Sequence, residues 1–245
     1  MIPWTQIGKA RVPGAETELR LMRRGAEFSM MLGQNELMNS RLNGSEKVLA
    51  TLSCRQIEGV QRPHVLIGGL GMGFTLRAAL AVLSAEARVT IAELVPEVIV
   101  WARGPMAELF GNSLNDPRAN IVEGDVADVI GSSASAFDAV LLDVDNGPEA
   151  LIRKANDGLY DSGGLKAIHR ALRPAGVLAV WSSGPNAAFS KRLRAADFEV
   201  NEVGVRATTK RSGAHHVIWL ATKSKAGSRT GSKPAASKSR SKTAR

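Results

Sequence analysis

Short apolar runs alternate with helical segments between residues 63 and 221, and this alternation narrows the choice of fold more than any other feature. Several of the runs, such as VLIGG, AVLLD and VLAVW, are continuously apolar, which is typical of parallel strands covered by helices on both faces. We therefore predict an α/β fold with a doubly wound, mostly parallel sheet. The expected strands are His64–Gly68, Arg88–Leu94, Asn120–Glu123, Phe137–Asp143 and Gly176–Ser182, and the expected helices are Phe74–Leu83, Pro96–Leu109, Leu165–Leu172 and Ala187–Ala196.

Two further strand-like runs, Glu199–Ala207 and His215–Ala221, have no helix between them. A turn around Lys210–Gly213 joins them, so we expect them to pair antiparallel. Five parallel strands finished by an antiparallel hairpin give seven strands. This is the outline of the class I S-adenosylmethionine-dependent transferases, which are Rossmann-like.

The first sixty residues predict a smaller segment. Glu18–Met22 and Glu27–Leu32 are strand-like and flank a turn at Arg24-Gly25, which indicates a β-hairpin. A helix is expected to follow, with Ser45 as its N-cap. Residues 1–60 would then form a hairpin and helix beside a transferase domain at 61–221. Sixty residues are marginal for independent stability, so this segment can also be a lid without a core of its own.

The charge of the chain is concentrated at one end. The net charge is +9, but residues 222–245 hold eight Lys and Arg and no acid, which leaves 24 basic and 23 acidic residues before them. Apart from one proline, this segment has no apolar residue larger than alanine, so we predict a disordered basic tail. Nucleic-acid binding is then not expected, except for weak contacts of the tail.

Other sequence features limit the cellular compartment and the kinds of site that we expect. The single cysteine, Cys54, excludes an intrachain disulfide and a thiolate metal cluster. The first residues lack the apolar run of a signal peptide, and no stretch approaches the length of a membrane span. We expect a cytoplasmic protein without membrane association that acts on a small molecule. The sequence leaves a homodimer open.

A glycine-rich loop directly follows the first parallel strand. Gly69, Gly71 and Gly73 remove side chains where the backbone must turn sharply and approach a ligand. Glu93 closes the next strand, where a carboxylate can accept hydrogen bonds from both ribose hydroxyls. Phe74 stands where a dinucleotide loop would need its last glycine, and the Gly-Lys-Ser/Thr ending of a P-loop is absent. The loop and the acid together predict a nucleoside ligand without a pyrophosphate.

Polar side chains also end the next two strands. Asp125 would lie against the adenine in this architecture, and it can also cap the short helix Val126–Ile130. Asp143 and Asp145 lie at the crevice where open α/β sheets bind ligands, and either can take a proton from an amine. The segment Asp-Asn-Gly-Pro at 145–148 is also strong turn chemistry, which is the alternative role for Asp145.

Two aromatic features remain ambiguous. Tyr160, the only tyrosine, follows Asn and Asp and can line a substrate pocket or pack in a half-buried position. His215 and His216 begin the last strand, where alternation puts one inward and one outward. No further residues show the spacing of metal ligands, so we predict no metal site.

These residues resemble the spermidine synthase (polyamine aminopropyltransferase) family over residues 17–183. The resemblance implies that Gly69–Gly73 holds the methionine-derived part of S-adenosylmethionine or its decarboxylated form, Glu93 the ribose and Asp125 the adenine. Asp143 would open the acidic active-site segment. The matching stretches are HVLIGGLGMGFTLRAAL, VTIAELVPEVIVWAR, DPRANIVEGDVADVI, FDAVLLDVDNGP and GLYDSGGLKAIHRALRPAGVLAV.

The chain departs from that family at the acceptor side. The family carries D-x-x-D-P, whereas here Asn146 holds the second acidic position and Asp145 lies one residue early. The family's Tyr-(His/Gln)-Glu segment appears as Gly44-Ser45-Glu46. We take Glu46, Asn146 and Tyr160 as candidate substrate residues. The resemblance implies transfer of an aminopropyl group to an amine or other small polar acceptor; methyl transfer on the same fold and nucleoside binding without catalysis are the alternatives.

Overall fold

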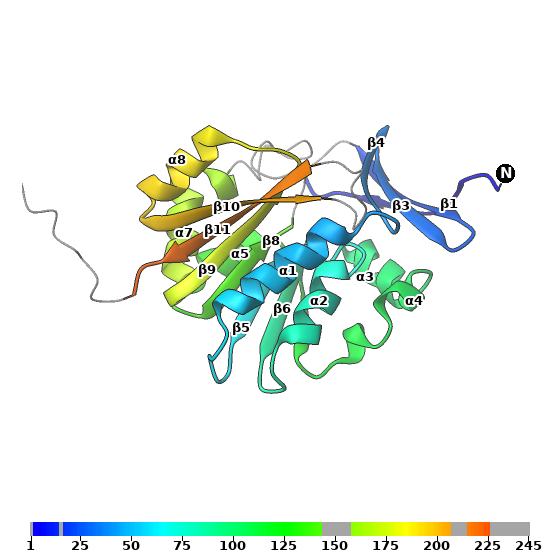
Figure 1. The fold of residues 1–245 in the computed structure, drawn as a ribbon. Coiled ribbons are helices and arrows are strands. Elements are labelled where there is room, and N and C mark those ends of the chain that lie inside the picture. Colours follow the sequence, from blue (N-terminus) through cyan, green and yellow to red (C-terminus); the bar gives the residue numbers. More distant parts are fainter. Residues whose placement is uncertain (1, 15–16, 144–157, 207–214, 226–245) are drawn as a thin grey trace, which may run out of the picture.

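The computed structural model describes residues 2–14, 17–143, 158–206 and 215–225. They form two sheets and a set of helices (Figure 1). The strands are β1 (Thr5–Arg11), β2 (Glu18–Arg24), β3 (Glu27–Leu32), β4 (Asn35–Asn39), β5 (His64–Gly68), β6 (Arg88–Glu93), β7 (Ala119–Glu123), β8 (Phe137–Leu142), β9 (Leu172–Ser182), β10 (Phe198–Arg206) and β11 (His215–Lys223). The helices are α1 (Gly44–Gln56), α2 (Phe74–Val82), α3 (Pro96–Arg103), α4 (Ala107–Phe110), η1 (Ser113–Asn115), α5 (Val126–Gly131), α7 (Ser162–Ala171) and α8 (Ala187–Ala195).

The larger sheet has seven strands in the order β10-β11-β9-β8-β5-β6-β7. Strands β5 to β9 pair in parallel, and β11 runs antiparallel to both β9 and β10. This confirms the predicted mostly parallel sheet and its antiparallel hairpin. The glycine loop follows β5 in the middle of the sheet, where the strand order changes direction and an open α/β sheet forms its ligand crevice. Within the described residues, no helix is long and apolar enough to span a membrane.

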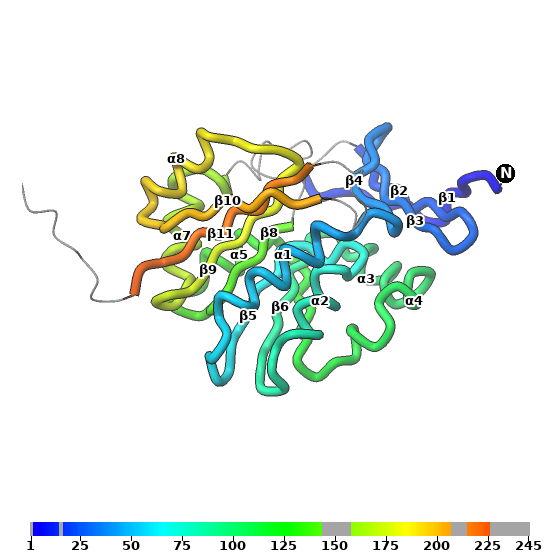
Figure 2. The backbone as a smooth tube through the Cα atoms, in the orientation of Figure 1, coloured from blue at the N-terminus to red at the C-terminus, as the bar shows by residue number. Residues whose placement is uncertain are grey.

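Helices cover both faces of this sheet, as the backbone tube also shows (Figure 2). Successive residues of a strand point to opposite faces. In β5 and β8, Ile67 and Leu141 therefore pack with α1, α2 and α3, whereas Leu66 and Leu142 pack with α5, α7 and α8. All four side chains are almost fully buried. Burial on both faces explains why these strands are continuously apolar in sequence.

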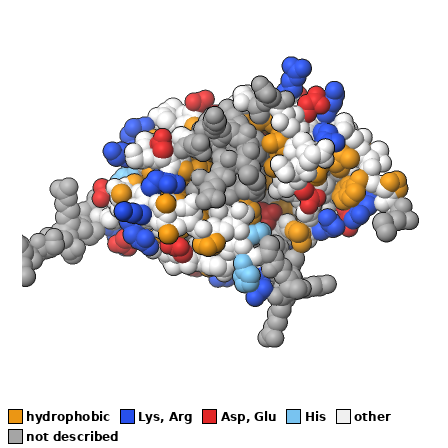
Figure 3. All heavy atoms as spheres, turned by 90° about the horizontal axis from the view of Figure 1, so that it is seen from above, with side chains coloured by type: hydrophobic (Ala, Val, Ile, Leu, Met, Phe, Trp, Pro, Cys, Tyr) orange, Lys and Arg blue, Asp and Glu red, His pale blue; other side chains and the backbone are white. Residues whose placement is uncertain are grey.

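The N-terminal segment contains more strands than the sequence analysis predicts. The expected hairpin is β2 and β3, and β1 and β4 extend it to a four-stranded antiparallel sheet. Strand β1 is mostly exposed and carries an irregularity next to Gly8, and β4 is short and polar. Neither has the apolar alternation by which a strand is recognised in a sequence. In the view from above, hydrophobic side chains gather on this N-terminal side of the molecule (Figure 3).

Several boundaries differ from the prediction, three of them for a local reason. Helix α1 begins two residues early, because its N-cap is Asn43 and not Ser45; the Ser45 hydroxyl bonds to side chains instead. The expected helix at 96–109 is broken into α3 and α4, because Pro105 disfavours helical backbone at the residue before it, Gly104. Strand β11 runs two residues into the predicted tail, since the Lys223 ammonium donates to the carbonyls of His169 and Leu172. The predicted turn at 210–213 lies outside the described residues.

Candidate active site

The glycine loop adopts the backbone that its sequence predicts. Gly69, Gly71 and Gly73 all have positive φ, at 86°, 50° and 76°, where residues with a Cβ are strained. A Cβ on Gly71 would lie 2.8 Å from the Met38 methyl group, and one on Gly73 would lie 2.3 Å from the Phe110 ring. The loop is therefore shaped both by its own backbone and by close approach of neighbouring elements.

Glu93 lies directly beneath this loop. Its carboxylate oxygens accept from the backbone N–H groups of Leu70 and Val95, each at 2.8 Å. Burial raises the pKa of Glu93, and the backbone hydrogen bonds oppose that rise. Glu93 thus joins the end of β6 to the glycine loop, and its remaining lone pairs are the acceptors available to a ribose.

Asp125 takes the capping role that the sequence allows. It is the N-cap of α5, and one carboxylate oxygen accepts from Ala127 N–H at 2.9 Å. Just before it, Gly124 N–H donates to the Glu93 carbonyl at 2.8 Å, which brings this turn against the end of β6. The ends of β5, β6 and β7, where the sequence predicts the nucleoside site, are thereby held together.

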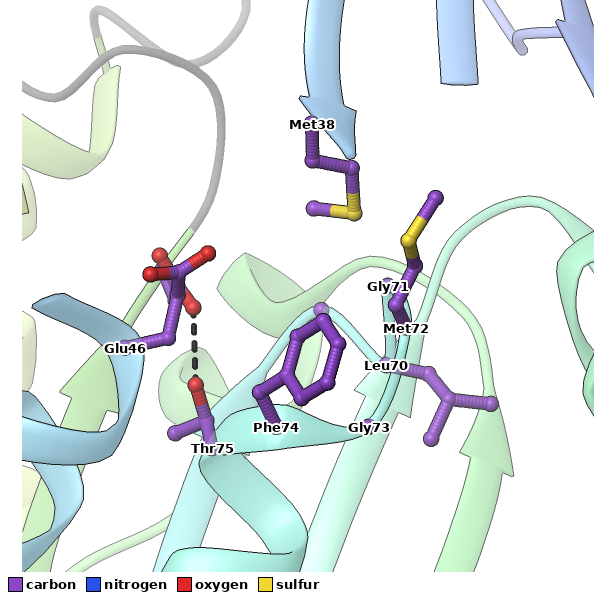
Figure 4. Close-up of a pocket in the computed structure, with 10 residues that line it drawn as sticks. Met38, Glu46, Leu70, Gly71, Met72, Gly73, Phe74 and Thr75 are labelled. Carbon is purple, nitrogen blue, oxygen red and sulfur yellow. Dashed lines mark hydrogen bonds between the residues drawn. The ribbon is translucent and has the colours of Figure 1, made fainter. Parts of the chain in front are cut away.

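A pocket opens beside the loop, and five predicted residues meet in it: Gly69, Gly71, Gly73, Glu46 and Asp143. Glu46 reaches in from α1 and Met38 overhangs from β4, opposite the loop (Figure 4). The sequence analysis did not identify Met38, because no local sequence pattern indicates that a methionine in a polar strand contacts a loop thirty residues later. It also missed Thr75, whose position two residues after the last loop glycine was the available signal. The other lining residues are Leu70, Met72 and Phe74.

The two acids of the pocket act on each other. Burial and, next, the nearby charge of Glu46 raise the pKa of Asp143 to about 7, against a hydrogen bond from the Thr75 hydroxyl at 2.8 Å that lowers it. Burial also raises the pKa of Glu46, against a bond from the Ser45 hydroxyl at 2.8 Å. Two carboxyl groups that share a partly desolvated site hold a proton more tightly than isolated ones. The pair can therefore both attract a cation and accept a proton near neutral pH.

The described residues lining this pocket include two acids and no Lys, Arg or His. Arg77, the basic side chain nearest the loop in sequence, turns away and donates to the Leu109 carbonyl at 2.5 Å. The two acids of the described lining can pair with an ammonium group, and an ammonium of the protein, that of Lys47, lies 5.7 Å from the centre of the Phe74 ring.

Among the described candidates, Glu93, Asp125 and Tyr160 do not line this pocket. Tyr160 is buried under α8, with its ring edge-on to Phe189 at 5.6 Å, in the cluster on the opposite face of the sheet. In the described part of the chain Tyr160 takes the position of a packing residue, and its contact with substrate stays a prediction. Asp145 and Asn146 lie outside the described residues. The part of the chain that the structure describes contains no group of three or more potential metal ligands.

Comparisons with known proteins agree with this architecture. The model of the spermine/spermidine synthase domain matches residues 49–193, which is more than half of the chain. Polyamine aminopropyltransferase 1 of Streptomyces coelicolor is 34% identical over 127 residues, or 50% of this chain and 23% of that protein. The polyamine aminopropyltransferase of Nitrosomonas europaea is 32% identical over 129 residues, or 52% of this chain and 37% of that protein. The chain thus aligns with less than half the length of these curated relatives.

Solved structures show the same fold. Spermidine synthase from Thermotoga maritima superposes with a TM-score of 0.71 at 20% identity, over 89% of this chain and 72% of that chain. A spermidine synthase in complex with the transition-state analogue AdoDATO gives a TM-score of 0.69, with the same identity and coverage. The matched domain, the fold and the order of the site residues lead to one conclusion: the chain belongs to the spermine/spermidine synthase family.

Proposed function

We propose that this protein transfers an aminopropyl group from decarboxylated S-adenosylmethionine to an amine of a small polyamine. The observation that carries the proposal is the pairing of Glu46 and Asp143 in a pocket whose described lining has no basic residue. Both substrates of this reaction carry ammonium groups, and the donor lacks the carboxylate that S-adenosylmethionine has. A pocket with two acids complements them.

The chemistry follows from the state of the acceptor. Its attacking amine must be neutral, because only the free lone pair can bond to the aminopropyl carbon beside the sulfonium. The C–N bond forms as the C–S bond breaks, methylthioadenosine leaves, and the nitrogen gives up one proton. Asp143, with its pKa raised to about 7, is a stronger base than an ordinary carboxylate and accepts that proton. Asp145 remains a second proposed proton acceptor.

The nucleoside of the donor would lie over the glycine loop. Glu93 would accept from its ribose, and Asp125 would accept from the exocyclic amine of its adenine with the oxygen that does not cap α5. Met38 and Met72 would surround the sulfonium end with thioether groups. Methyl transfer would place a carboxylate-bearing donor in the same pocket, where the described lining supplies no cation to pair with it.

The test is to supply each donor separately with 1,4-diaminobutane and to identify the products. We expect methylthioadenosine and the aminopropylated amine from the decarboxylated donor, and no S-adenosylhomocysteine from S-adenosylmethionine. Asp143→Asn should lower turnover by roughly 10²–10⁴-fold, the usual contribution of a general base. Asp128→Asn, an exposed aspartate on α5, is the matched control and should leave turnover unchanged.

Each other outcome contradicts the proposal in a distinct way. S-adenosylhomocysteine as the product would establish methyl transfer. Calorimetric binding of methylthioadenosine without turnover of any amine would establish a nucleoside-binding protein without catalysis.

A further inference from the structure

Resting on the proposed function, we propose that Ser45 and His216 form a relay that carries the substrate's proton from the acidic pair to solvent. The relay starts at Glu46 and continues through Ser45, the residue before it on α1. It joins α1 to the last strand of the sheet, between residues 171 positions apart in the chain.

The contacts form a continuous hydrogen-bonded chain. The Ser45 hydroxyl lies 2.8 Å from Glu46 Oε2 and 3.1 Å from His216 Nδ1. Ser45 is only 2% exposed, so water does not compete for its hydroxyl. A buried hydroxyl between a carboxyl group and an imidazole is able to accept a proton from one and to donate its own to the other.

The imidazole is held in place and reaches toward solvent. Its ring lies edge-on to Trp181, at 4.7 Å between ring centres and 73° between planes. His216 is partly exposed, in contrast to buried Ser45, so the relay runs from the interior to the surface.

The surroundings favour a neutral imidazole that is ready to accept. Burial, followed by the neighbouring His215, lowers the pKa of His216. Opposite it, β10 places Val205 in register, β9 contributes Trp181, and α1 contributes Ser45 with Glu46 beyond it. On these elements, the charged or titratable groups around the imidazole of His216 are thus His215, Glu46 and Arg206. Arg206 follows Val205 on β10 and pairs in register with His215.

The proton transfer balances without any further reactant. The acceptor's ammonium group gives one proton to the Asp143–Glu46 pair and becomes the neutral amine that attacks. Glu46 passes a proton to the Ser45 oxygen while the Ser45 hydroxyl proton moves to His216 Nδ1, and the imidazolium releases its Nε2 proton to water. The carboxylate and the hydroxyl are then restored, and the imidazole is left as its Nδ1–H tautomer. Proton exchange with water, which returns it to the Nε2–H tautomer, prepares it for the next cycle.

One test does not depend on activity. The ring resonances of the four histidines are titrated by NMR and assigned with His→Gln variants. We expect the apparent pKa of His216 to fall in Glu46→Gln and in Ser45→Ala, because each change removes the path to a negative charge. His169, which contacts Phe198 on the other side of the sheet, should titrate unchanged. An unchanged pKa of His216 in both variants would overturn the relay. If Ser45→Ala does not fold, the pKa of His216 in Glu46→Gln is the deciding measurement.

The second test measures turnover. His216→Gln and Ser45→Ala should lower kcat by about tenfold or more, less than the roughly 10²–10⁴-fold of the group that takes the proton itself. The affinity for methylthioadenosine should not change, and added imidazole should restore part of the kcat of His216→Ala. His169→Gln is the matched control. An unchanged kcat in both relay variants would overturn the relay without contradicting aminopropyl transfer. Absence of transfer by the unaltered protein would instead refute the proposed function, and the NMR result would not be affected.

Discussion

Single residues decide the electrostatics of the pocket. Asp143 directly follows β8 and Glu46 lies on α1, almost a hundred residues earlier, and each raises the cost of ionising the other. Among the described residues, Thr75 and Ser45 supply the side-chain hydrogen bonds that favour their charged forms. An ammonium group of a substrate would offset the same repulsion, so substrate binding and deprotonation of the pair are coupled.

Stability should depend on pH through Asp143. The pKa of its carboxyl is about 7 in the folded protein and near 3.8 when unfolded, so the folded state binds more protons between these values. The stabilisation relative to the unfolded chain is complete below about pH 4 and is lost as pH rises through 7. The unfolding free energy of the unaltered protein should therefore decline between pH 4 and 7, by on the order of 1 kcal/mol for each unit by which the two pKa values differ. This decline should be smaller in Asp143→Asn, which lacks the titrating group. Urea titrations at several pH values measure it, and equal slopes for both proteins would contradict it.

Glu93 should contribute to both stability and ligand binding. In Glu93→Gln, one oxygen is replaced by an NH₂ group that faces a backbone N–H, of Leu70 or of Val95. A buried donor left unsatisfied costs about 1–3 kcal/mol. We expect a loss of that size in unfolding free energy and a similar loss in methylthioadenosine affinity, measured by calorimetry. Glu123→Gln, the exposed residue paired with Glu93 across β6 and β7, is the matched control. Lost stability with unchanged affinity would remove Glu93 from the ribose site.

At the scale of elements, the junction between β5 and α2 depends on Gly73. This residue is the N-cap of α2 in a left-handed conformation, and a Cβ there would overlap the Phe110 ring of α4. We expect Gly73→Ala to lower the unfolding free energy by more than the roughly 1–2 kcal/mol of the left-handed conformation alone. Gly131→Ala, in α5 with open space around it, should be neutral or stabilising. Denaturant unfolding of both variants tests this, and an equal effect of the two would contradict it.

The sequence predicts elements well where the signal is local. The bounds of β5 are predicted to the residue, and those of β6, β8 and α8 to within one, because apolar runs and turn residues mark them. The glycine loop is predicted for the same reason, since its positive φ values require glycine. The contact of Met38 with Gly71 and the bond of Ser45 to His216 depend on tertiary packing, and no sequence periodicity encodes them.

At the scale of the whole molecule, the N-terminal sheet shares its core with the larger sheet. Leu21 of β2 and Met30 of β3 belong to the same buried cluster as Ile67 of β5. Trp101 of α3 lies against β1, where a Cβ on Gly8 would approach its indole nitrogen to 2.6 Å. The N-terminal strands are therefore packed as part of the fold that holds Met38 over the glycine loop.

This shared core predicts that the protein unfolds in one transition. Leu21→Ala removes a fully buried side chain and should lower the unfolding free energy by about 2–5 kcal/mol. Leu178→Ala, equally buried in the cluster on the opposite face, is the matched control and should produce a loss of similar size. Trp101 reports on the N-terminal side and Trp219 on the opposite face, so urea unfolding is followed in variants in which one of these two is the single tryptophan left of the four in the chain. Because the two clusters share the strands of one sheet, we expect both signals to change at the same urea concentration in each Leu→Ala variant. An earlier transition seen by Trp101 alone in Leu21→Ala would show instead that residues 1–60 unfold as a separate unit and that the glycine loop keeps its structure without them.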